Sequence, residues 1–382
     1  MFKKTLAAAA VLALCATGAM AADVTIYGRI DTGLQYNHSD PGVGDASDSF
    51  KMHTGQHDAN RLGLKGSEKL SDNLTVGFQL ENGFNSDDGT LKNNNVKHEG
   101  DTLFDREAQL YVSGGFGQVG FGRMGLLRSG AGSYNLLGDV SAMTTGWGSV
   151  GDQSVLLGDV GTNRMDNTIV YRTPKLAGFQ VHAQYAMGGS TADYEGVENE
   201  SSSNRYYGLG VTYAMGGLKA VALVDTMNER SAGTGATKDP EDMKSVSLAV
   251  NYDFGVARAY LFGQYFKDVN GIGGLPGVSS SKLSGDEIKG WALMTGVKAP
   301  VAGGSFRFTL GYMDAEDKGA GKTAAADNEV KRFLIGTGYD YPLSKSTLVY
   351  CAAGYWQDSY FKAGVVDDAS NFQALAGILT RF

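Results

Sequence analysis

The 382-residue chain has little cysteine, proline or tryptophan and no excess of positive charge. One of its two cysteines, Cys15, lies in an apolar N-terminal run, so only Cys351 remains for the folded protein and an internal disulfide is excluded. The formal net charge of −8 argues against nucleic acid as a partner, because nucleic-acid-binding domains are basic. Beyond the N-terminal run there is no apolar stretch of roughly 18 residues, so no transmembrane helix is predicted.

Residues 1–21 have the parts of a secretory signal peptide: two early lysines, a short apolar core and an A-x-A site that ends at Ala21. A lipoprotein signal is the alternative, because Cys15 lies near the end of the apolar core. Leu14 precedes that cysteine, however, where a small residue would be needed. We therefore expect cleavage after Ala21, which leaves 22–382 as a single exported domain.

Glycine is abundant, with 55 residues, about twice its usual share of ~7%. Apolar residues recur at every second position in many segments, as in 245–254 and 305–312. In both segments one face is aliphatic and aromatic, and the other carries Ser, Asn, Asp, Arg, Thr or Gly. The mean hydropathy of −0.19 does not exclude a membrane barrel, because lipid-facing and water-facing residues alternate along its strands.

Sixteen such segments are joined by links that are alternately short and long, which is typical of an up-and-down meander. In a membrane the sheet must close, because an open edge would leave backbone polar groups unpaired in hydrocarbon. We predict an all-β fold, a 16-stranded antiparallel up-and-down transmembrane β-barrel with a water-filled lumen. The predicted strands lie near 23–37, 61–70, 74–84, 103–115, 118–127, 167–174, 179–188, 205–216, 218–229, 244–255, 256–268, 287–301, 304–317, 330–344, 346–360 and 372–382, with boundary errors of about two to four residues.

A soluble β-sandwich or solenoid is the alternative fold. It would have to bury its apolar faces against each other, and it does not explain the strict alternation of short and long links. It also leaves unexplained the tyrosines and phenylalanines near the strand ends, which suit the aromatic girdles of a membrane barrel.

Gly115, Gly117 and Gly120 spell G-x-G-x-x-G, the fingerprint of a dinucleotide-binding loop. That fingerprint requires a helix to open at its last glycine, whereas the residues up to Arg123 alternate at strand spacing. We predict instead a tight turn at Phe116 and Gly117 between antiparallel strands, with Gly115 and Gly117 supplying the conformational freedom.

Several stretches, in this order and spacing, resemble the general diffusion porins of the Gram-negative outer membrane. The resemblance covers the whole mature chain and implies a homotrimer with one pore in each subunit. It further implies an outer-membrane channel for passive diffusion of ions and small hydrophilic solutes, narrowed by an inward-folded third loop. No cofactor or metal is implied. The stretches are Val24–Arg29, Arg61–Glu68, Gly77–Phe84, Phe116–Arg123, Asn163–Pro174 and Arg381–Phe382.

The longest link, 128–166, follows the fifth strand and is the loop that the resemblance expects to fold inward. In such porins the loop brings carboxylates to face basic side chains on the wall. Asp139 and Asp152 are candidates for this acidic side, while Asp159 and Asp166 could equally tie the loop to the wall. The family's proline-glutamate stretch at the loop tip is missing, so the choice among these carboxylates stays open.

The basic side is expected on the inner wall. Alternation turns Arg29 inward, because Ile30 and its partners of the same parity take the lipid face. Arg106 matches the family motif, although the pattern then turns Glu107 and Gln109 outward, into a polar trimer contact. From alternation and resemblance together, the candidate wall bases are Arg29, Arg61, Lys65, Arg106, Arg164 and Arg172.

The final residue, Phe382, resembles the terminal signature that the barrel-assembly machinery reads; the alternative is one girdle aromatic among others. An enzyme of the outer membrane is not predicted, because the five histidines form no catalytic constellation. His53 and His57 are four residues apart, but they lie in a loop and not on a helix, so no metal site is predicted. A substrate-specific channel of the same fold is the alternative function.

Overall fold

The computed structural model describes eleven ranges of the chain, which together form one antiparallel sheet. The predicted signal peptide lies outside them. Within these ranges no helix is long and apolar enough to cross a membrane. The described residues are 23–42, 44–92, 102–143, 146–148, 150–151, 164–189, 203–228, 241–272, 283–317, 328–362 and 365–382.

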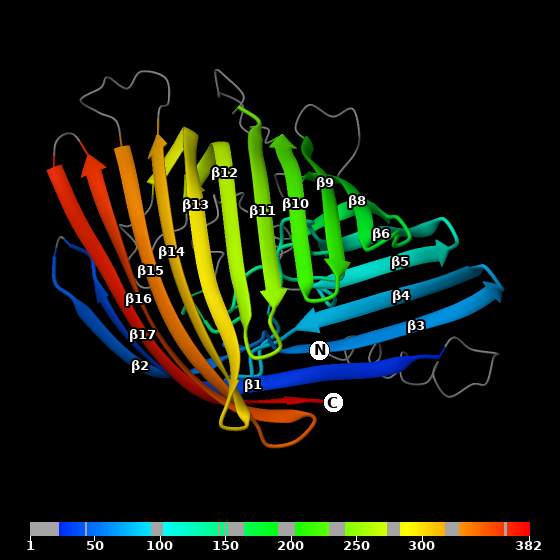
Figure 1. Ribbon diagram of the computed structural model, residues 1–382, viewed down its shortest axis with the longest axis horizontal. Coiled ribbons are helices and arrows are strands. Elements are labelled where there is room, and N and C mark those ends of the chain that lie inside the picture. Colours follow the sequence, from blue (N-terminus) through cyan, green and yellow to red (C-terminus); the bar gives the residue numbers. More distant parts are fainter. Residues whose placement is uncertain are drawn as a thin grey trace, which may run out of the picture.

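The sheet closes into a ring (Figure 1). Its first and last strands run antiparallel, in register from Arg29 opposite Arg381 to Asp40 opposite Ser370. Beyond that ladder, the Gly28 N–H donates to the Phe382 carbonyl at 3.0 Å, and the Phe382 N–H donates back at 3.1 Å. The strands are β1 (Thr25–Asp40), β2 (Ser47–Thr54), β3 (Arg61–Ser71), β4 (Leu74–Gly83), β5 (Glu107–Gly114), β6 (Gly117–Gly125), β7 (Arg164–Arg172), β8 (Phe179–Gly189), β9 (Ser203–Met215), β10 (Leu218–Asn228), β11 (Met243–Asp253), β12 (Arg258–Ile272), β13 (Leu283–Val301), β14 (Gly304–Asp317), β15 (Asn328–Pro342), β16 (Thr347–Lys362) and β17 (Val365–Arg381).

The sheet has 17 strands, one more than predicted. The additional strand is β2, which lies in the long link predicted between the first two strands and pairs with Thr32–Ser39 of β1. β3 pairs with Thr25–Arg29 of β1, on the same side of β1 as β2. Because β2 and β3 share one side of β1, the ring itself keeps the sixteen predicted positions, and the barrel prediction is confirmed.

The predicted short links are confirmed as tight connections between neighbouring antiparallel strands. In the β5–β6 hairpin Gly114 pairs with Gly117, so Gly115 and Phe116 form the turn. Gly117 has a φ of 109°, and a Cβ there would collide with the Arg172 carbonyl. The requirement for glycine therefore falls on Gly117, whereas Gly115 needs no positive φ, contrary to the prediction.

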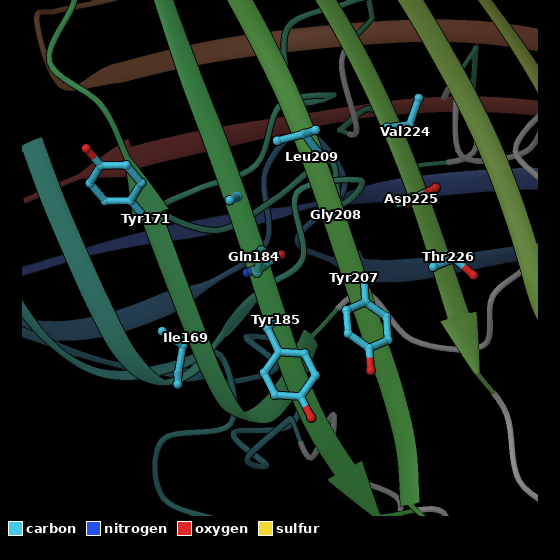
Figure 2. A pocket seen from close by; sticks show the side chains of 11 residues that line it. Ile169, Tyr171, Gln184, Tyr185, Tyr207, Gly208, Leu209, Val224, Asp225 and Thr226 are labelled. Carbon is cyan, nitrogen blue, oxygen red and sulfur yellow. The ribbon is translucent and has the colours of Figure 1, made fainter.

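The outer face of the barrel is apolar, as strand β11 illustrates. Val246, Leu248 and Val250 are exposed there, and Ser247 between them is fully buried. Alternation of this kind suits a wall with lipid on one side and the lumen on the other. A shallow hollow of about 540 Å³ lies on this outer face between β7 and β10, where Tyr185 and Tyr207 flank Gly208 (Figure 2).

The inner face is not polar throughout, and to that extent the prediction is wrong. Phe262, Phe266 and Met294 point inward and are buried. Trp356 on β16 also points inward and is buried. They belong to one apolar cluster with residues of the link after β6, including Leu127. An apolar segment that lies inside the barrel must bury its side chains against the wall, which explains apolar residues on that part of the inner face.

Candidate functional site

The link after β6 contacts inward-facing side chains from many strands of the barrel, from Glu107 of β5 to Arg307 of β14. We call its described residues, 126–143, 146–148 and 150–151, the inner loop. At its start the Leu127 N–H donates to Gln184 Oε1 of β8 at 2.7 Å, and the Gln184 amide donates back to the Gly125 carbonyl at 3.0 Å. Further along, Gly151 lies against Thr309 of β14.

A buried ion pair fixes the beginning of the inner loop. Arg128 Nε lies 3.6 Å from Asp225 Oδ2, and the two side chains are 2% and 0% exposed. The Tyr206 hydroxyl donates to the same carboxylate at 3.1 Å, and the Ser245 hydroxyl donates to its other oxygen. A buried carboxylate with this many partners holds its arginine firmly, because separating the pair would leave a charge uncompensated in the interior.

The predicted acidic residues of the loop can be placed only in part. Asp139 Oδ2 accepts a hydrogen bond from Lys219 Nζ of β10 at 3.1 Å, and the Asp139 carbonyl accepts one from the Asn251 amide at 3.2 Å. Asp166 pairs with Arg123 at 2.7 Å and thus ties the return of the loop to β6. Asp152 and Asp159 lie outside the described residues, so their role as constriction acids stays a prediction.

The far part of the inner loop is attached to β14 and to the link before β3. We call its attachment to that link the latch. Arg307 of β14 donates to the Ala142 carbonyl at 2.9 Å and lies over the Trp147 ring, 5.2 Å from its centroid. The Gly148 N–H donates to the Gln56 carbonyl at 2.6 Å. The His57 ring packs on Trp147, with 4.3 Å between the two centroids.

Hydrogen bonds to the barrel wall fix the position of His57. Asp31 of β1 accepts backbone hydrogen bonds from His57 at 2.7 Å and Asp58 at 2.8 Å, and it accepts a third at 2.6 Å from the Tyr350 hydroxyl. Burial lowers the pKa of His57 to about 3, and the charges of Arg307, Arg381 and other cations lower it further. The imidazole is therefore neutral where it packs against Trp147.

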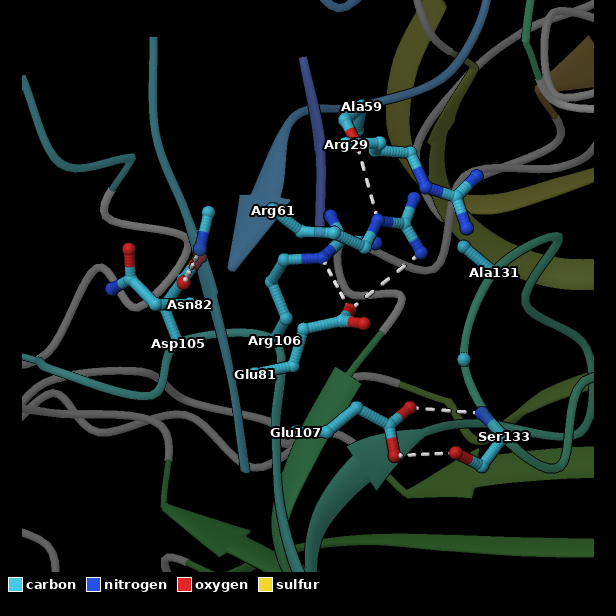
Figure 3. Close-up of polar contacts among 12 residues, drawn as sticks. Arg29, Ala59, Arg61, Glu81, Asn82, Asp105, Arg106, Glu107, Ala131 and Ser133 are labelled. Carbon is cyan, nitrogen blue, oxygen red and sulfur yellow. Dashed lines mark hydrogen bonds and ion pairs between the residues drawn. The ribbon is translucent and has the colours of Figure 1, made fainter. Parts of the chain in front are cut away.

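Next to His57, at Asp58, the wall presents a cluster of arginines around one carboxylate (Figure 3). Glu81 Oε1 of β4 accepts from Arg106 Nε at 2.6 Å and lies 3.6 Å from Arg61 Nη1 of β3. The Tyr27 hydroxyl donates to Glu81 Oε2 at 3.0 Å. Arg61 also donates to Asp58 Oδ1 at 2.8 Å, and Arg29 pairs with the other oxygen of Asp58.

Strand register aligns three of the arginines across adjacent strands. Arg29 of β1 lies directly opposite Arg381 of β17 on one side and Arg61 of β3 on the other. Side chains that face each other in an antiparallel pair share one face of the sheet, so all three point into the lumen. Arg381 is not among the predicted wall bases, although the pairing of the first with the last strand would place it beside Arg29.

The wall base Arg106 lies just before the strand that was predicted to contain it. Arg106 precedes β5, so strand alternation does not decide its direction, and it reaches Glu81 from the end of the preceding link. Glu107 and Gln109 are 1% and 4% exposed and point inward, so the predicted outward trimer contact by these two residues is wrong. Glu107 instead accepts hydrogen bonds from the Ser133 backbone at 2.8 Å and hydroxyl at 3.0 Å, and so holds the inner loop.

The remaining predicted wall bases lie in three different surroundings. Arg164 lies within the field of the cluster, where the charges of Arg106 and Glu107 act on it. Lys65 Nζ lies over the Tyr27 ring at 5.3 Å from its centroid, and the Arg172 guanidinium lies over the Tyr134 ring at the same distance. The carboxylates that balance the cluster, Glu81 and Asp58, were not singled out from the sequence, although Glu81 has the inward parity of a lumen residue.

In the described part of the chain no three His, Cys, Asp or Glu side chains gather where they could hold a metal ion. The titratable groups of the lumen are arranged instead as ion pairs and as one-sided rows along the wall. Such an arrangement provides an electric field across a passage.

The chain is similar in sequence to known proteins over nearly its whole length. The profile of the family described as Gram-negative porin matches residues 7–359. An outer membrane porin protein of Bordetella pertussis is 31% identical over 410 residues, covering 100% of both chains. Outer membrane porin protein 32 of Delftia acidovorans is 30% identical over 353 residues, covering 91% of this chain and 88% of the relative.

Solved structures agree with the sequence comparison. The anion-selective porin from Comamonas acidovorans superimposes with a TM-score of 0.68 at 25% identity, over 95% of this chain and 100% of the other. A profile match across most of the sequence, relatives of matching length and a closed barrel of the same form all lead to one conclusion. The chain belongs to the Gram-negative porin family.

Proposed function

We propose that this outer-membrane porin is a water-filled channel through which ions and small hydrophilic solutes diffuse passively, with a preference for anions. The observation that carries the proposal is the inward row Arg381, Arg29 and Arg61, extended by Arg106. Two carboxylates, Asp58 and Glu81, make ion pairs with Arg29, Arg61 and Arg106, so the four guanidiniums of the row outnumber the carboxylates paired with them.

The inner loop supplies the other side of the proposed constriction. Its contacts with β8, β10, β11 and β14 support a course along the wall opposite the arginine cluster. A hydrated solute then meets a narrowed passage in which size and the transverse field decide its permeation. Among the candidate acids of the inner loop, Asp139 is the one that the structure describes. It pairs with Lys219, which weakens the negative charge on this side of the passage and favours anions.

The similarity to a porin named as anion-selective supports the same preference. A solved structure of the same fold, OmpT of Vibrio cholerae, is described as a trimer form, and we extend the homotrimer to this chain by that likeness in fold. Export by the signal peptide at 1–21 and recognition of Phe382 by the barrel-assembly machinery complete the proposal. No cofactor and no energy source enter the mechanism.

A general diffusion channel and a substrate-specific channel differ in how current depends on solute concentration. We expect single-channel conductance in planar bilayers to rise in proportion to salt, and liposomes with the protein to swell in a range of small sugars at rates set by size. Current that saturates with one solute while other solutes of that size are excluded would favour the specific channel. Liposomes that stay impermeable to all of them would contradict the proposal.

A further inference from the structure

A second row of inward cations lies across β12, β13 and β14, on strands other than those of the arginine cluster. Arg258 of β12 is directly opposite Lys298 of β13, and Lys298 is directly opposite Arg307 of β14. Each lies within a few residues of a short turn, since β12 begins at Arg258, β13 ends at Val301 and β14 begins at Gly304. The row therefore lines the mouth of the barrel at the short-turn end.

The two outer cations of this row have carboxylate partners and the middle one does not. Arg258 donates to Asp253 at 2.8 Å. Arg307 Nε donates to Asp340 Oδ2 at 3.0 Å, and Arg307 Nη2 lies 2.9 Å from the same oxygen. Lys298 makes no hydrogen bond or ion pair with any residue in the part of the chain that the structure describes. Its ammonium group keeps three donors for another partner.

The inner loop contacts this row of cations. Arg307 donates to the Ala142 carbonyl, and Ala142 lies against Gly296, two residues before Lys298 on the same face of β13. The charges of Arg307, Asp340, Asp139 and Arg258 all act on Lys298. An anion that has passed the inner loop toward the short-turn mouth would therefore meet Lys298 next, with a guanidinium on either side.

Like charges directly opposite one another on neighbouring strands destabilise a sheet. The two carboxylates of this row relieve the outer positions and leave one uncompensated positive charge at its centre. A small anion bound at Lys298 would remove that imbalance, and its oxygens could also accept from the flanking guanidiniums.

We propose that Lys298, flanked by Arg258 and Arg307, is a binding site for one small oxyanion, a phosphate or a carboxylate, on the short-turn side of the inner loop. The site rests on the proposed function, because it serves anions that enter or leave the channel. It lies on strands different from those of the arginine cluster, so the two can be tested separately.

Inorganic phosphate, added in turn to either side of a planar bilayer, is the probe, and block of the chloride current through the full-length porin is the readout. We expect saturable block, with lower half-blocking concentration from one side than from the other. Lys298→Gln should weaken the block roughly fivefold or more, because it removes a charge-assisted hydrogen bond. Lys298→Arg should retain it. Lys345→Gln is the matched control, since it removes the same charge from an exposed turn at this end of the barrel.

Loss of block in Lys298→Gln, with block retained in both Lys298→Arg and Lys345→Gln, supports the site. The site is overturned if phosphate does not block the unmodified channel or blocks Lys298→Gln equally well. It is also overturned if Lys345→Gln loses the block to the same extent as Lys298→Gln. The zero-current potential of the unmodified channel in a salt gradient is recorded in the same bilayers. An anion-preferring potential together with an unblocked channel rejects the site alone, whereas a cation-preferring potential rejects the proposed function.

Discussion

At the scale of single residues, Glu81 sets how much positive charge the arginine cluster offers to the lumen. It is 4% exposed and contacts Arg61, Arg106 and Tyr27. Because like-charged guanidiniums lie so close together, a carboxylate among them is needed to keep the cluster folded. The same carboxylate reduces the field that a passing anion feels.

Replacing Glu81 by Gln is expected to raise the preference for anions, because the amide keeps the shape and loses the negative charge. The measurement is the zero-current potential in a salt gradient, compared with that of Glu68→Gln, which neutralises an exposed glutamate near a turn. Removing one partner from a buried ion pair costs about 3 kcal/mol, so heat stability of the folded barrel should also fall. An unchanged potential in a folded Glu81→Gln channel would contradict the role given to this residue.

Arg61 and Arg172 were both predicted from the sequence as wall bases, yet their surroundings differ. Arg61 is in the row at the centre of the cluster, whereas Arg172 ends β7 and lies over the Tyr134 ring. Arg61→Gln should therefore shift selectivity toward cations, and Arg172→Gln should shift it less. Zero-current potentials of the two variants make the comparison, and equal shifts would count against the assignment of the cluster.

At the scale of elements, the latch between the inner loop and the link before β3 depends on a neutral His57. The ring packs between Trp147 and Tyr350, whose centroids lie 4.3 Å and 5.0 Å away. Arg29, Arg307, Arg381 and Lys298 act on the ring as positive charges, and Asp31 accepts its backbone N–H. A positive charge on this ring would be both desolvated and repelled.

The pH dependence follows from the lowered pKa of His57. The folded latch keeps its ring neutral down to a pKa of about 3, whereas a released ring would take up a proton near the ordinary value of 6.5. The released form therefore binds more protons between these values, so the latch is most stable above pH 6.5 and weakens as the pH falls toward 3.

We expect the unmodified channel to show more frequent current fluctuations as the pH falls through this window. His57→Phe keeps an aromatic ring between Trp147 and Tyr350 but cannot be protonated, so its fluctuations should depend less on pH. The comparison is made at equal voltage and salt. Identical pH profiles for the two proteins would exclude His57 as the titrating group.

The elements themselves were largely predictable, because alternation and turn residues act locally. The hairpin at Gly115 and Phe116 and the ring of antiparallel strands follow from such patterns. The direction of Arg106 did not follow, since it precedes its strand, and neither did the buried Phe262 and Phe266, since these depend on where the inner loop packs. The pairing of Arg61 with Glu81 is a contact between side chains on neighbouring strands, which alternation alone does not specify.

At the scale of the whole molecule, closure depends on the two ends of the chain. Phe382 and Gly28 exchange two backbone hydrogen bonds, and the Phe382 ring lies against Gly28, where a Cβ would collide with it. The ring is 61% exposed on the outer face. It is thus accessible to lipid or to an assembly factor while its backbone seals the barrel.

Phe382→Ser is expected to lower the amount of folded porin in the outer membrane, if this ring is the signal read during assembly. Phe254→Ser is the matched control, because Phe254 is 63% exposed at the end of β11 beside a short turn. The yield of folded barrel is measured by electrophoresis of unheated membranes. Equal losses in the two variants would indicate that Phe382 acts as one lipid-facing aromatic among others.

The central claim is that arginines aligned across the joined ends of the barrel give the lumen an excess of positive charge. The zero-current potential of the unmodified porin across a tenfold KCl gradient in a planar bilayer tests it most directly, because potassium and chloride have nearly equal mobilities in water. The account predicts a potential with the sign of chloride permeation. A potential with the sign of potassium permeation would contradict it.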